Sequence, residues 1–436
     1  MGKNSNVKRQ MSKLMSKTIE YGLYLLVFLL PLQTRWIIKA GPTEYLTYSL
    51  YGTDILLILL LLLFIFYKFP IKIQNYLIVG LLAIAAVSVF FALDKALALY
   101  KFGWLVLGAG LFWLITKAAY SRARLVWSLL IGLGLQAVLG SWQFLAQATF
   151  ANKWLGLALH RASDLGASVI ETMGADGVGE RWLRAYGGLD HPNMLGGMLA
   201  IGIILILYLS FAGAPDKKSP ALRATPLLKG FQILFSAALF FSFSRAAWLA
   251  LAAGLAAGLL AAIIKKDLRA QRNLLETILV SGLIFFILFF QFPNLVMTRL
   301  YSGERLEIKS KSERLESIKN SWPIIKNNWA SGVGVGNYTL ALGRQRPGEQ
   351  PYFYQPVHNV FVLAFSEIGI IGMLLFVFLF VRFPGSSPGL KARNNQAMIL
   401  VALIVVMSLD HWLWSLHFGM LFFWLAIGLA YRDSCG

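Results

Sequence analysis

Charged residues are scarce in this sequence, and their scarcity limits what kind of protein it can be. Only 14% of the 436 residues are Asp, Glu, Lys or Arg, and 58% are hydrophobic. A soluble domain carries about a quarter of its residues charged, so a water-soluble enzyme and a disordered protein are both excluded. Apolar runs that recur along the chain indicate a membrane protein instead.

Cysteine and acidic residues are also rare. Cys435 is the single cysteine, which excludes an intramolecular disulfide and argues against a cysteine-based metal site. The 20 acidic residues stand against 40 basic ones, for a formal net charge of +20. On a soluble domain this excess would indicate nucleic-acid binding. In a membrane protein it first reports on which side of the bilayer each loop lies, so no nucleic-acid partner is expected.

Closely spaced metal-binding motifs are absent as well. The histidines form no His-x-x-x-His or His-Glu-x-x-His pair. They are His160, His191, His358, His411 and His417. No Asp-x-Asp pair occurs in the segments expected outside the membrane. We therefore expect neither a metal ion nor another cofactor.

The sequence does contain a series of apolar runs long enough to cross a bilayer, which takes about 20 helical residues. The first 17 residues are polar and basic, and no small-residue cleavage site follows the next apolar stretch. We therefore expect an uncleaved first transmembrane helix. The sequence predicts an all-α polytopic membrane protein with 12 spans. They are expected at 18–38, 50–67, 75–93, 97–116, 125–145, 192–213, 228–243, 246–264, 274–292, 357–381, 396–410 and 412–431.

Basic residues indicate on which side of the membrane each loop lies. Every short loop expected to be cytoplasmic is basic if the N-terminus is cytoplasmic, and both termini then lie inside. The division at Ser244–Arg245 is required, because merging its two spans would move the cluster around Lys265 outside. The chain is expected to have three parts. These are spans one to nine over 1–292 with an outside loop near 146–190, a large outside loop over 293–356, and three final spans over 357–436.

The large outside loop combines charge with an amphipathic helix. Its nine basic residues against five glutamates suit an anionic ligand, although ion pairs on a solvated helix explain the same composition. Ser312–Asn328 is predicted to be a helix that Pro323 kinks. Its apolar stripe can lie on the membrane surface or on the helical bundle, and consists of Leu315, Ile318, Trp322 and Ile325. A flexible turn is expected at Gly332–Gly336, and because no Lys-Ser/Thr follows it, a phosphate loop is rejected.

Ionisable residues at membrane depth are costly and are therefore candidates for function. Arg245 stands at the outer end between two apolar spans, where it must meet an anion, a carbonyl or water. It can equally be an anchor that reaches the interface. His358 lies at the outer mouth of the tenth span and can take a proton from a hydroxyl. A lone histidine, however, more often only hydrogen-bonds at an interface.

A helix that includes His358 would place it on one seam with several other residues. These are Val362, Phe365, Gly369 and Gly372, and the glycines would allow another helix to approach closely. Glu367 would lie deeper, on roughly the opposite face, in a structural pairing.

Two further groups lie at the outer ends of spans. The segment Arg184–Asn193 opens the sixth span, where Pro192 suits a first helical turn and Asp190 or His191 can cap it. Capping alone explains much of this segment. Asp410 can orient or neutralise a nearby cation, or only end the eleventh span. The topology nevertheless gathers six candidates at one face, which favours an active site there: Arg184, His191, Arg245, Arg314, His358 and Asp410.

Several of these pieces, in this order, resemble the O-antigen ligases and the related O-antigen polymerases and bacterial O-oligosaccharyltransferases. Arg245 followed by Leu249 is similar to an arginine-x3-leucine motif, and His358 followed by Gly369 to a histidine-x10-glycine motif. Between them lie Ser312-Glu313-Arg314, Trp322 and Gly332–Gly336, and His191-Pro192-Asn193 opens the sixth span as in many members. The resemblance covers about 184–431.

The resemblance implies a GT-C-type glycosyltransferase that takes a glycan from undecaprenyl diphosphate and passes it to an acceptor hydroxyl. The site would lie at the periplasmic face of the bacterial inner membrane. His358 would be the general base, and Arg245 and Arg314 would bind the donor diphosphate. The reaction would be inverting and metal-independent, with arginines in the place of a metal. Neighbours implied in the site are Arg184, His191, Asn359 and Asp410.

The leading prediction is an O-antigen ligase whose partners are the lipid-linked donor, a lipid A-core acceptor and membrane lipid. The nearest alternatives keep the donor and change the acceptor: a polymerase that extends another lipid-linked glycan, or a transferase onto protein Ser/Thr. A flippase or another transporter of lipid-linked oligosaccharides is a different class, and it should carry charges along a path across both leaflets. The candidate residues gather on the outer side instead, which favours the enzyme.

Overall fold

The computed structural model describes residues 2–68, 76–164, 166–173, 179–212, 220–301, 305–382 and 390–432, so Cys435 lies outside the described residues. The described chain is mostly helical, and its strands form two short antiparallel hairpins. One hairpin pairs β1 (Arg35–Lys39) with β2 (Tyr48–Tyr51), and the other pairs β3 (Val169–Met173) with β4 (Gly179–Leu183). The predicted helical class is confirmed for this part of the chain.

Each predicted span corresponds to helical structure. The first nine spans correspond to α1 (Gly2–Leu29), α2 (Gly52–Lys68), α3 (Tyr76–Phe90), α4 (Lys95–Lys117), α5 (Arg122–Ala146), α6 (Pro192–Ala212), α7 (Pro220–Phe241), α8 (Arg245–Ile264) and α9 (Leu268–Gln291). The last three correspond to α13 (Val360–Arg382), α14 (Leu390–Leu409) and the pair α15 (Trp412–Ser415) and α16 (His417–Arg432). Within the described residues, six helices are long and apolar enough to cross a membrane, namely α4, α5, α6, α8, α9 and α13.

Two predicted boundaries, the end of the first span and the division at Ser244–Arg245, can be compared with the helices. The first span, predicted to end at 38, is wrong at its end, because α1 ends at Leu29 and residues 35–39 form β1. Pro31 cannot continue the helix, and the β-branched residues after it favour a strand. The division at Ser244–Arg245 agrees with the helices: the Ser244 side chain accepts a hydrogen bond from Ala247 N and begins α8.

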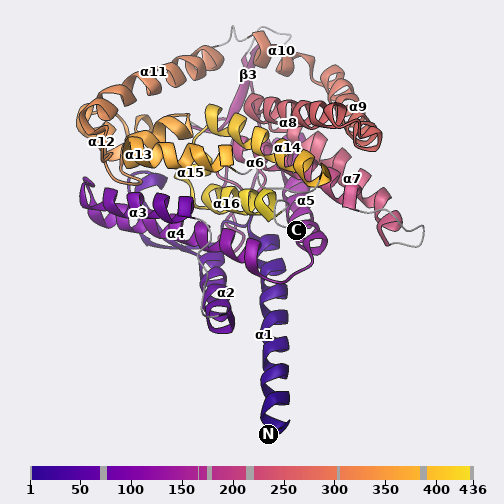
Figure 1. The fold of residues 1–436 in the computed structure, drawn as a ribbon. Coiled ribbons are helices and arrows are strands. Elements are labelled where there is room, and N and C mark those ends of the chain that lie inside the picture. The colour runs from indigo at the N-terminus through magenta and orange to yellow at the C-terminus, as the bar shows by residue number, and fades with distance from the viewer. Residues whose placement is uncertain are drawn as a thin grey trace.

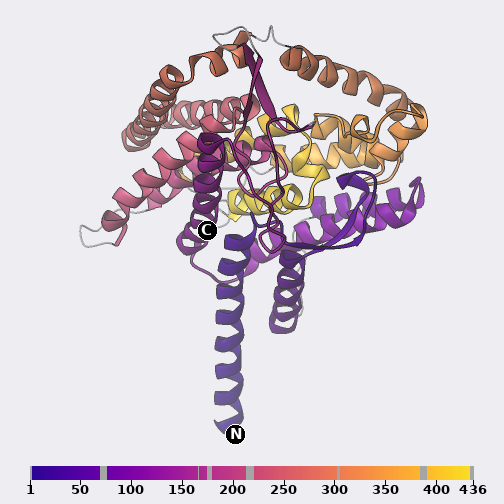
Figure 2. The same cartoon turned by 180° about the vertical axis from the view of Figure 1, so that it is seen from behind.

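Burial distinguishes central helices from peripheral ones. The apolar stretch of α6 is 83% buried and that of α9 only 17%. α6 packs against α5, α7, α8 and α14, whereas α9 exposes large apolar side chains such as Leu279 and Phe286. Such a face would be unfavourable in water and suits lipid. The N-terminal end of α1 projects from one end of the molecule, and α10 and α11 lie at the opposite end (Figure 1, Figure 2).

The large loop consists of α10 (Pro293–Tyr301), α11 (Arg305–Asn328) and α12 (Tyr338–Gln345), followed by a 3-10 turn at Pro351–Phe353. The predicted helix at 312–328 is thus confirmed as part of α11, which continues through Pro323. Its predicted stripe is divided. Ile325 is buried, whereas Leu315, Ile318 and Trp322 are exposed, as the membrane-surface alternative requires.

The predicted helical seam through His358 is wrong. α13 begins only at Val360, because the Asn359 side chain accepts a hydrogen bond from Val362 N and caps the helix. Gly369, with φ 70°, interrupts α13. The glycine turn docks at this break: Val333 N donates to Ser366 O at 2.9 Å, and Ile370 N donates to Trp329 O at 2.9 Å. His358 therefore lies on the loop before α13 and not on a helix face.

Candidate active site

His358 and Asp410 meet although 51 residues of the chain separate them. His358 stands two residues before α13, and Asp410 follows the last residue of α14. His358 Nδ1 lies 3.7 Å from Asp410 Oδ1, an ion-pair distance that is longer than a hydrogen bond. The His411 ring is also close, with its centroid 5.0 Å from that of His358. A carboxylate beside one ring nitrogen leaves Nε2 of His358 for a substrate.

Asp410 is held in place by two hydrogen bonds. Its Oδ2 accepts from Asn193 Nδ2 at 2.7 Å, and its Oδ1 accepts from the His411 backbone N at 2.8 Å. Hydrogen bonds donated to both carboxylate oxygens favour its ionised form. The carboxylate is therefore ionised and positioned, which is what a partner for a catalytic histidine requires.

Asn193 extends this network to Arg184. Arg184 Nη2 donates to Asn193 Oδ1 at 2.8 Å, while its Nε donates to Ser242 O at 2.8 Å. Arg184 is buried, and its guanidinium joins the turn between α7 and α8 to the start of α6. The structure thus brings Arg184, Asp410 and His358 into one connected group, as the shared face predicted.

Buried glutamines of α5 hold the segment that carries Arg184. Gln143 Oε1 accepts hydrogen bonds from Tyr186 N and Gly187 N, and its Nε2 donates to Gly187 O at 2.8 Å. Gln136 accepts from Gly188 N. A side-chain amide can satisfy backbone groups of a tight turn that has no secondary-structure partner. The glycine pair of this segment is therefore fixed against α5, and Arg184 with it.

His191 acts as a helix cap, as the capping interpretation of this segment allowed. Its Nδ1 accepts a hydrogen bond from Asn193 N at 3.0 Å, and Nε2 lies 2.8 Å from Ser168 Oγ. Burial, helped by the Arg184 charge, lowers the pKa of His191 to about 3. Both ring nitrogens are engaged, so His191 supports the site and does not face a substrate. Asn359 is likewise engaged, because its Nδ2 donates to Ser408 O at 3.1 Å.

The turn between α7 and α8 is surrounded by arginines. Arg245 Nη1 donates to Arg299 O at 3.0 Å, and Arg299 Nη2 donates to Phe243 O at 2.8 Å. Phe243 has φ 46°, a left-handed conformation that non-glycine residues rarely adopt. Arg245 thus stands at the N-terminus of α8, half-buried, where the helix dipole also favours an anion.

A cavity of about 290 Å³ opens beside His358. It is lined by His358 and Gln355 on one side and by polar residues of α11, including Ser312, Glu316 and Asn320, on the other. Arg314 lies half-exposed on α11 but is not among the residues that line this cavity. The structure therefore places Arg314 on the helix that lines the cavity but not in the lining itself.

Three side chains at the site could hold a metal ion by their chemistry. The ligand atoms of His358, Asp410 and His411 lie within 4.8 Å of one another. Two of these groups are already engaged, because Asp410 accepts two hydrogen bonds and His411 Nδ1 lies 2.7 Å from Ser415 Oγ. Two histidines and a carboxylate are nonetheless a donor set that iron or zinc can use. The motif search could not find it, because His358 and Asp410 are far apart in sequence.

Sequence reasoning also missed two residues of the network. Asn193 bridges Arg184 and Asp410, and although it belongs to the motif His191-Pro192-Asn193, it was not singled out as a site residue. Arg299 supports the α7–α8 turn and is buried, but it was one of nine basic residues in its loop. Only the tertiary contacts identify them.

Residues 231–377 match a family model described as O-Antigen ligase. No curated protein sequence gives a match. Among solved structures, one chain has a TM-score of 0.39 and 16% identity, over 83% of this chain and 98% of that chain. That structure is described as "Structural coordination of polymerization and crosslinking by a peptidoglycan synthase complex".

The matched segment begins in α7 and ends in α13 beyond its break. It contains the residues on which the resemblance in the sequence was founded, including Arg245, Arg314 and His358. The resemblance predicted from those residues is thereby confirmed over residues 231–377, which match the O-antigen ligase family model.

Proposed function

We propose that this protein is an O-antigen ligase that transfers a glycan from undecaprenyl diphosphate to a sugar hydroxyl of lipid A-core. The family supports a glycosyltransferase-like enzyme of lipopolysaccharide biosynthesis with a lipid-linked donor and a membrane setting. One observation carries the finer proposal: Asp410, held by Asn193, lies 3.7 Å from His358 beside a cavity that α11 lines. This is the arrangement of a general base with a carboxylate partner.

In the proposed reaction His358 Nε2 takes the proton of the acceptor hydroxyl. The hydroxyl oxygen attacks the anomeric carbon of the donor glycan, and the bond from that carbon to the diphosphate oxygen breaks. A single displacement of this kind inverts the anomeric configuration and releases undecaprenyl diphosphate. The ionised Asp410 stabilises the imidazolium that forms, as a carboxylate does in a catalytic triad. A positioned general base accelerates a reaction by about 10²–10⁴-fold.

Arginines are proposed to bind the donor diphosphate. Arg245 is half-buried at the N-terminus of α8, so its charge and the helix dipole favour an anion at the same place. Arg314 is proposed to reach the diphosphate from α11, next to the cavity. Arg184 is a positioning residue, because its guanidinium donates hydrogen bonds to Asn193 and Ser242. Bidentate arginines offset the charge of a leaving diphosphate.

We place the protein in the bacterial inner membrane as a GT-C-type enzyme with 12 spans, both termini cytoplasmic and the site periplasmic. The six long apolar helices and the exposed apolar face of α9 support a membrane setting. The positive-inside pattern supports the orientation.

The acceptor is the feature that distinguishes the related activities. Purified protein in nanodiscs would be given a defined lipid-diphosphate glycan and, separately, lipid A-core, a second lipid-linked glycan and a pilin-like peptide. Transfer to lipid A-core supports the proposal. Transfer only to the second glycan would make the protein a polymerase, and transfer only to the peptide would make it a protein O-oligosaccharyltransferase. If the protein transferred glycan to none of the three acceptors and instead transported the glycolipid in vesicles, the proposal that it is an enzyme would be overturned.

Metal independence is part of the proposal and has its own test. The same transfer reaction would be run in EDTA after exhaustive dialysis against chelator. We expect unchanged activity, because arginines supply the positive charge. Loss of activity that added Mg²⁺, Mn²⁺, Fe²⁺ or Zn²⁺ restores would show that His358, Asp410 and His411 hold a metal.

A further inference from the structure

The β1–β2 hairpin turns one strand towards the helices and the other away from them. β2 is fixed on α4, because the Tyr100 hydroxyl accepts a hydrogen bond from Ser49 N at 2.8 Å and donates one to Ser49 O at 2.6 Å. Among the described strands β1 pairs only with β2, so no strand lies along its second edge. All five residues of β1 are exposed, whereas those of β2 are alternately half-buried and buried. β1 is therefore the outward strand.

Large apolar side chains gather on this outward strand and on the loop beside it. Trp36 is 75% exposed, and Trp154, in the loop after α5, is 74% exposed. The loop contacts the chain just before β1, because Thr34 Oγ1 donates a hydrogen bond to Trp154 O at 2.7 Å. A contiguous exposed apolar surface marks a place of interaction. This tryptophan patch consists of Trp36, Ile37, Ile38, Trp154 and Leu155.

The tryptophan patch is tied to the ends of helices that we place in the membrane. β1 begins shortly after α1 ends at Leu29, β2 leads directly into α2 at Gly52, and the loop with Trp154 follows the end of α5 at Ala146. Tryptophan is enriched at the boundary between lipid and water, where its ring meets acyl chains and its N–H meets polar groups. An unpaired strand edge is not tolerated in the hydrocarbon region, but water and headgroups satisfy it at the boundary.

The two segments that carry the patch are basic on balance. From residue 30 to 51 and from 147 to 164, four basic residues stand against two acidic ones, namely Arg35, Lys39, Lys153 and Arg161 against Glu44 and Asp164. Lys39 and Lys153 are exposed and make no ion pair with any described residue. Lys153 Nζ lies 5.1 Å from the centroid of the Trp154 ring, and Lys39 Nζ lies 5.9 Å from that of Tyr48. Lysines beside aromatic rings suit the level of anionic headgroups.

We propose that the tryptophan patch is a membrane anchor at the boundary between lipid and water, with Lys39 and Lys153 contacting anionic phospholipid headgroups. Trp36, Ile38 and Trp154 contact the upper part of the acyl chains, and the free edge of β1 bonds to water and headgroups. The orientation given under the proposed function puts this anchor in the periplasmic leaflet, and in that one respect the inference rests on the proposed function.

Single fluorescent labels on protein in nanodiscs test the depth of the patch. In the Cys435→Ser background, Ile38→Cys and Trp154→Cys would each carry an NBD label, and Glu349→Cys, exposed after α12, is the control. Lipids with a nitroxide close to the headgroup should quench positions 38 and 154 more strongly than lipids with a nitroxide near the chain end. Aqueous iodide should quench these two positions little and position 349 strongly.

The contact with anionic headgroups is tested with the label at position 38. At equal mole fraction, nitroxide-labelled phosphatidylglycerol should quench about twofold more than phosphatidylcholine with the nitroxide at the same place, because each lysine near an anionic surface favours it about fivefold. The double variant Lys39→Gln/Lys153→Gln should lose this preference. Lys319→Gln/Lys326→Gln on α11 removes the same charge and should keep it.

Several results would overturn the anchor. Quenching of positions 38 and 154 by iodide and not by nitroxide lipids would show that the patch faces water. Quenching by neither would show that another polypeptide covers it, and stronger quenching from the chain end would place it in the hydrocarbon region. Equal quenching by the two lipids, or a preference that survives in Lys39→Gln/Lys153→Gln, would refute the anionic contact. Because no glycan transfer is measured, failure of the anchor and failure of the proposed ligase are distinguishable.

Discussion

Asp410 is the residue whose surroundings say most about the chemistry. Its two hydrogen bonds fix the carboxylate beside His358 Nδ1. Asp410→Asn keeps the size of the side chain and removes the charge that would stabilise an imidazolium. We expect the rate constant for transfer to fall by about 10²–10⁴, with the KM for the donor nearly unchanged. Steady-state kinetics with the lipid-linked glycan measure both quantities.

The matched control for this variant is Asp164→Asn. Asp164 is exposed in the segment between α5 and α6, and its side chain accepts a local hydrogen bond from Arg161 N. It should keep full activity. A loss in Asp410→Asn that appeared in KM and not in the rate constant would argue that Asp410 organises the donor site and not the base.

His191 makes a prediction about stability and pH. The unfolded chain protonates this histidine near pH 6.5, whereas the folded protein, in which its pKa is about 3, does not. Because the folded pKa is depressed, its contribution is complete above pH 6.5 and is lost progressively as the pH falls towards 3. We expect His191→Gln to make the fall in unfolding temperature between pH 6.5 and pH 4.5 shallower than in the wild type. Identical slopes in both proteins would show that His191 is solvated.

The sequence could identify site residues whose polarity is unusual for their position. His358, Arg184 and Asp410 are polar groups at the ends of apolar runs. In the structure Asp410 lies beside His358, and Asn193 joins Asp410 to Arg184. Asn193 and Arg299 are ordinary in sequence and gain their roles only from long-range contacts. Whether His191 caps a helix or faces a substrate depends on a hydrogen bond that sequence leaves open.

The break in α13 is the element on which the loop before it depends. A Cβ at Gly369 would come 2.1 Å from Ala330 O, and φ there is 70°. Gly369→Ala should therefore destabilise the protein by about 1–3 kcal/mol and displace the glycine turn. Thermal unfolding in detergent measures the first effect. Gly282→Ala in α9, where nothing lies within 4 Å, is the control and should stabilise the protein slightly, by up to about 1 kcal/mol.

Equal stability of Gly369→Ala and Gly282→Ala would mean that α13 can straighten at no cost in free energy.

Hydrophobic periodicity could not predict the break in α13 at Gly369. The run from Val360 to Arg382 is apolar throughout, and the interruption comes from the docking of Val333 and Gly334 on the carbonyls of Ser366 and Glu367. In the same way β1 was hidden in an apolar run, because a strand needs its partner β2 to form.

Over the whole molecule, the orientation of the helices is the claim most open to direct test. Cys435→Ser gives a cysteine-free background, since the chain has a single cysteine. Into it, Lys319→Cys on α11 and Arg124→Cys at the start of α5 introduce exposed thiols. A membrane-impermeant maleimide should label position 319 in spheroplasts and position 124 only after lysis. Labelling of position 124 in intact spheroplasts would reverse the topology.

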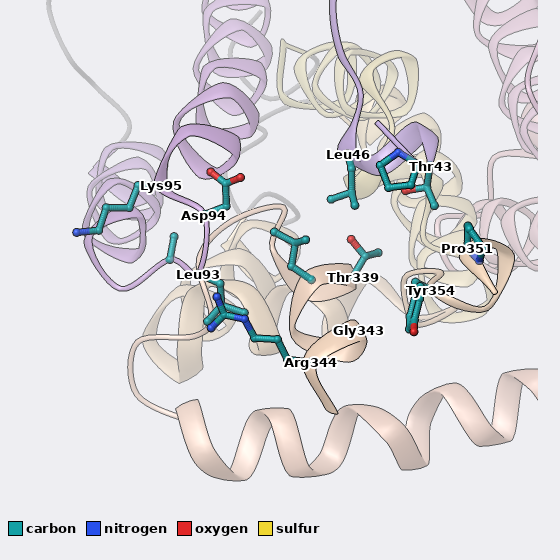
Figure 3. Close-up of a pocket in the computed structure, with 13 residues that line it drawn as sticks. Thr43, Leu46, Leu93, Asp94, Lys95, Thr339, Gly343, Arg344, Pro351 and Tyr354 are labelled. Atoms are coloured by element: carbon teal, nitrogen blue, oxygen red, sulfur yellow. The ribbon is translucent and has the colours of Figure 1, made fainter. Parts of the chain in front are cut away.

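The sequence predicted the helical class and the face at which the candidates gather, because apolar length and basic loops are local properties. It could not predict distances within that face. Arg314, for example, is on the expected loop helix but not among the residues lining the His358 cavity. A pocket of about 860 Å³ likewise joins segments near positions 43, 94 and 344 that no motif connects (Figure 3).

The central claim is that His358 is the base of a glycan transfer, and one measurement tests it most directly. Purified His358→Ala and wild type would be compared in nanodiscs for transfer of a lipid-diphosphate glycan to lipid A-core and, in parallel, for equilibrium binding of the donor. The account predicts that transfer falls by about 10²–10⁴ while donor binding is retained. Wild-type transfer rates in His358→Ala would contradict it.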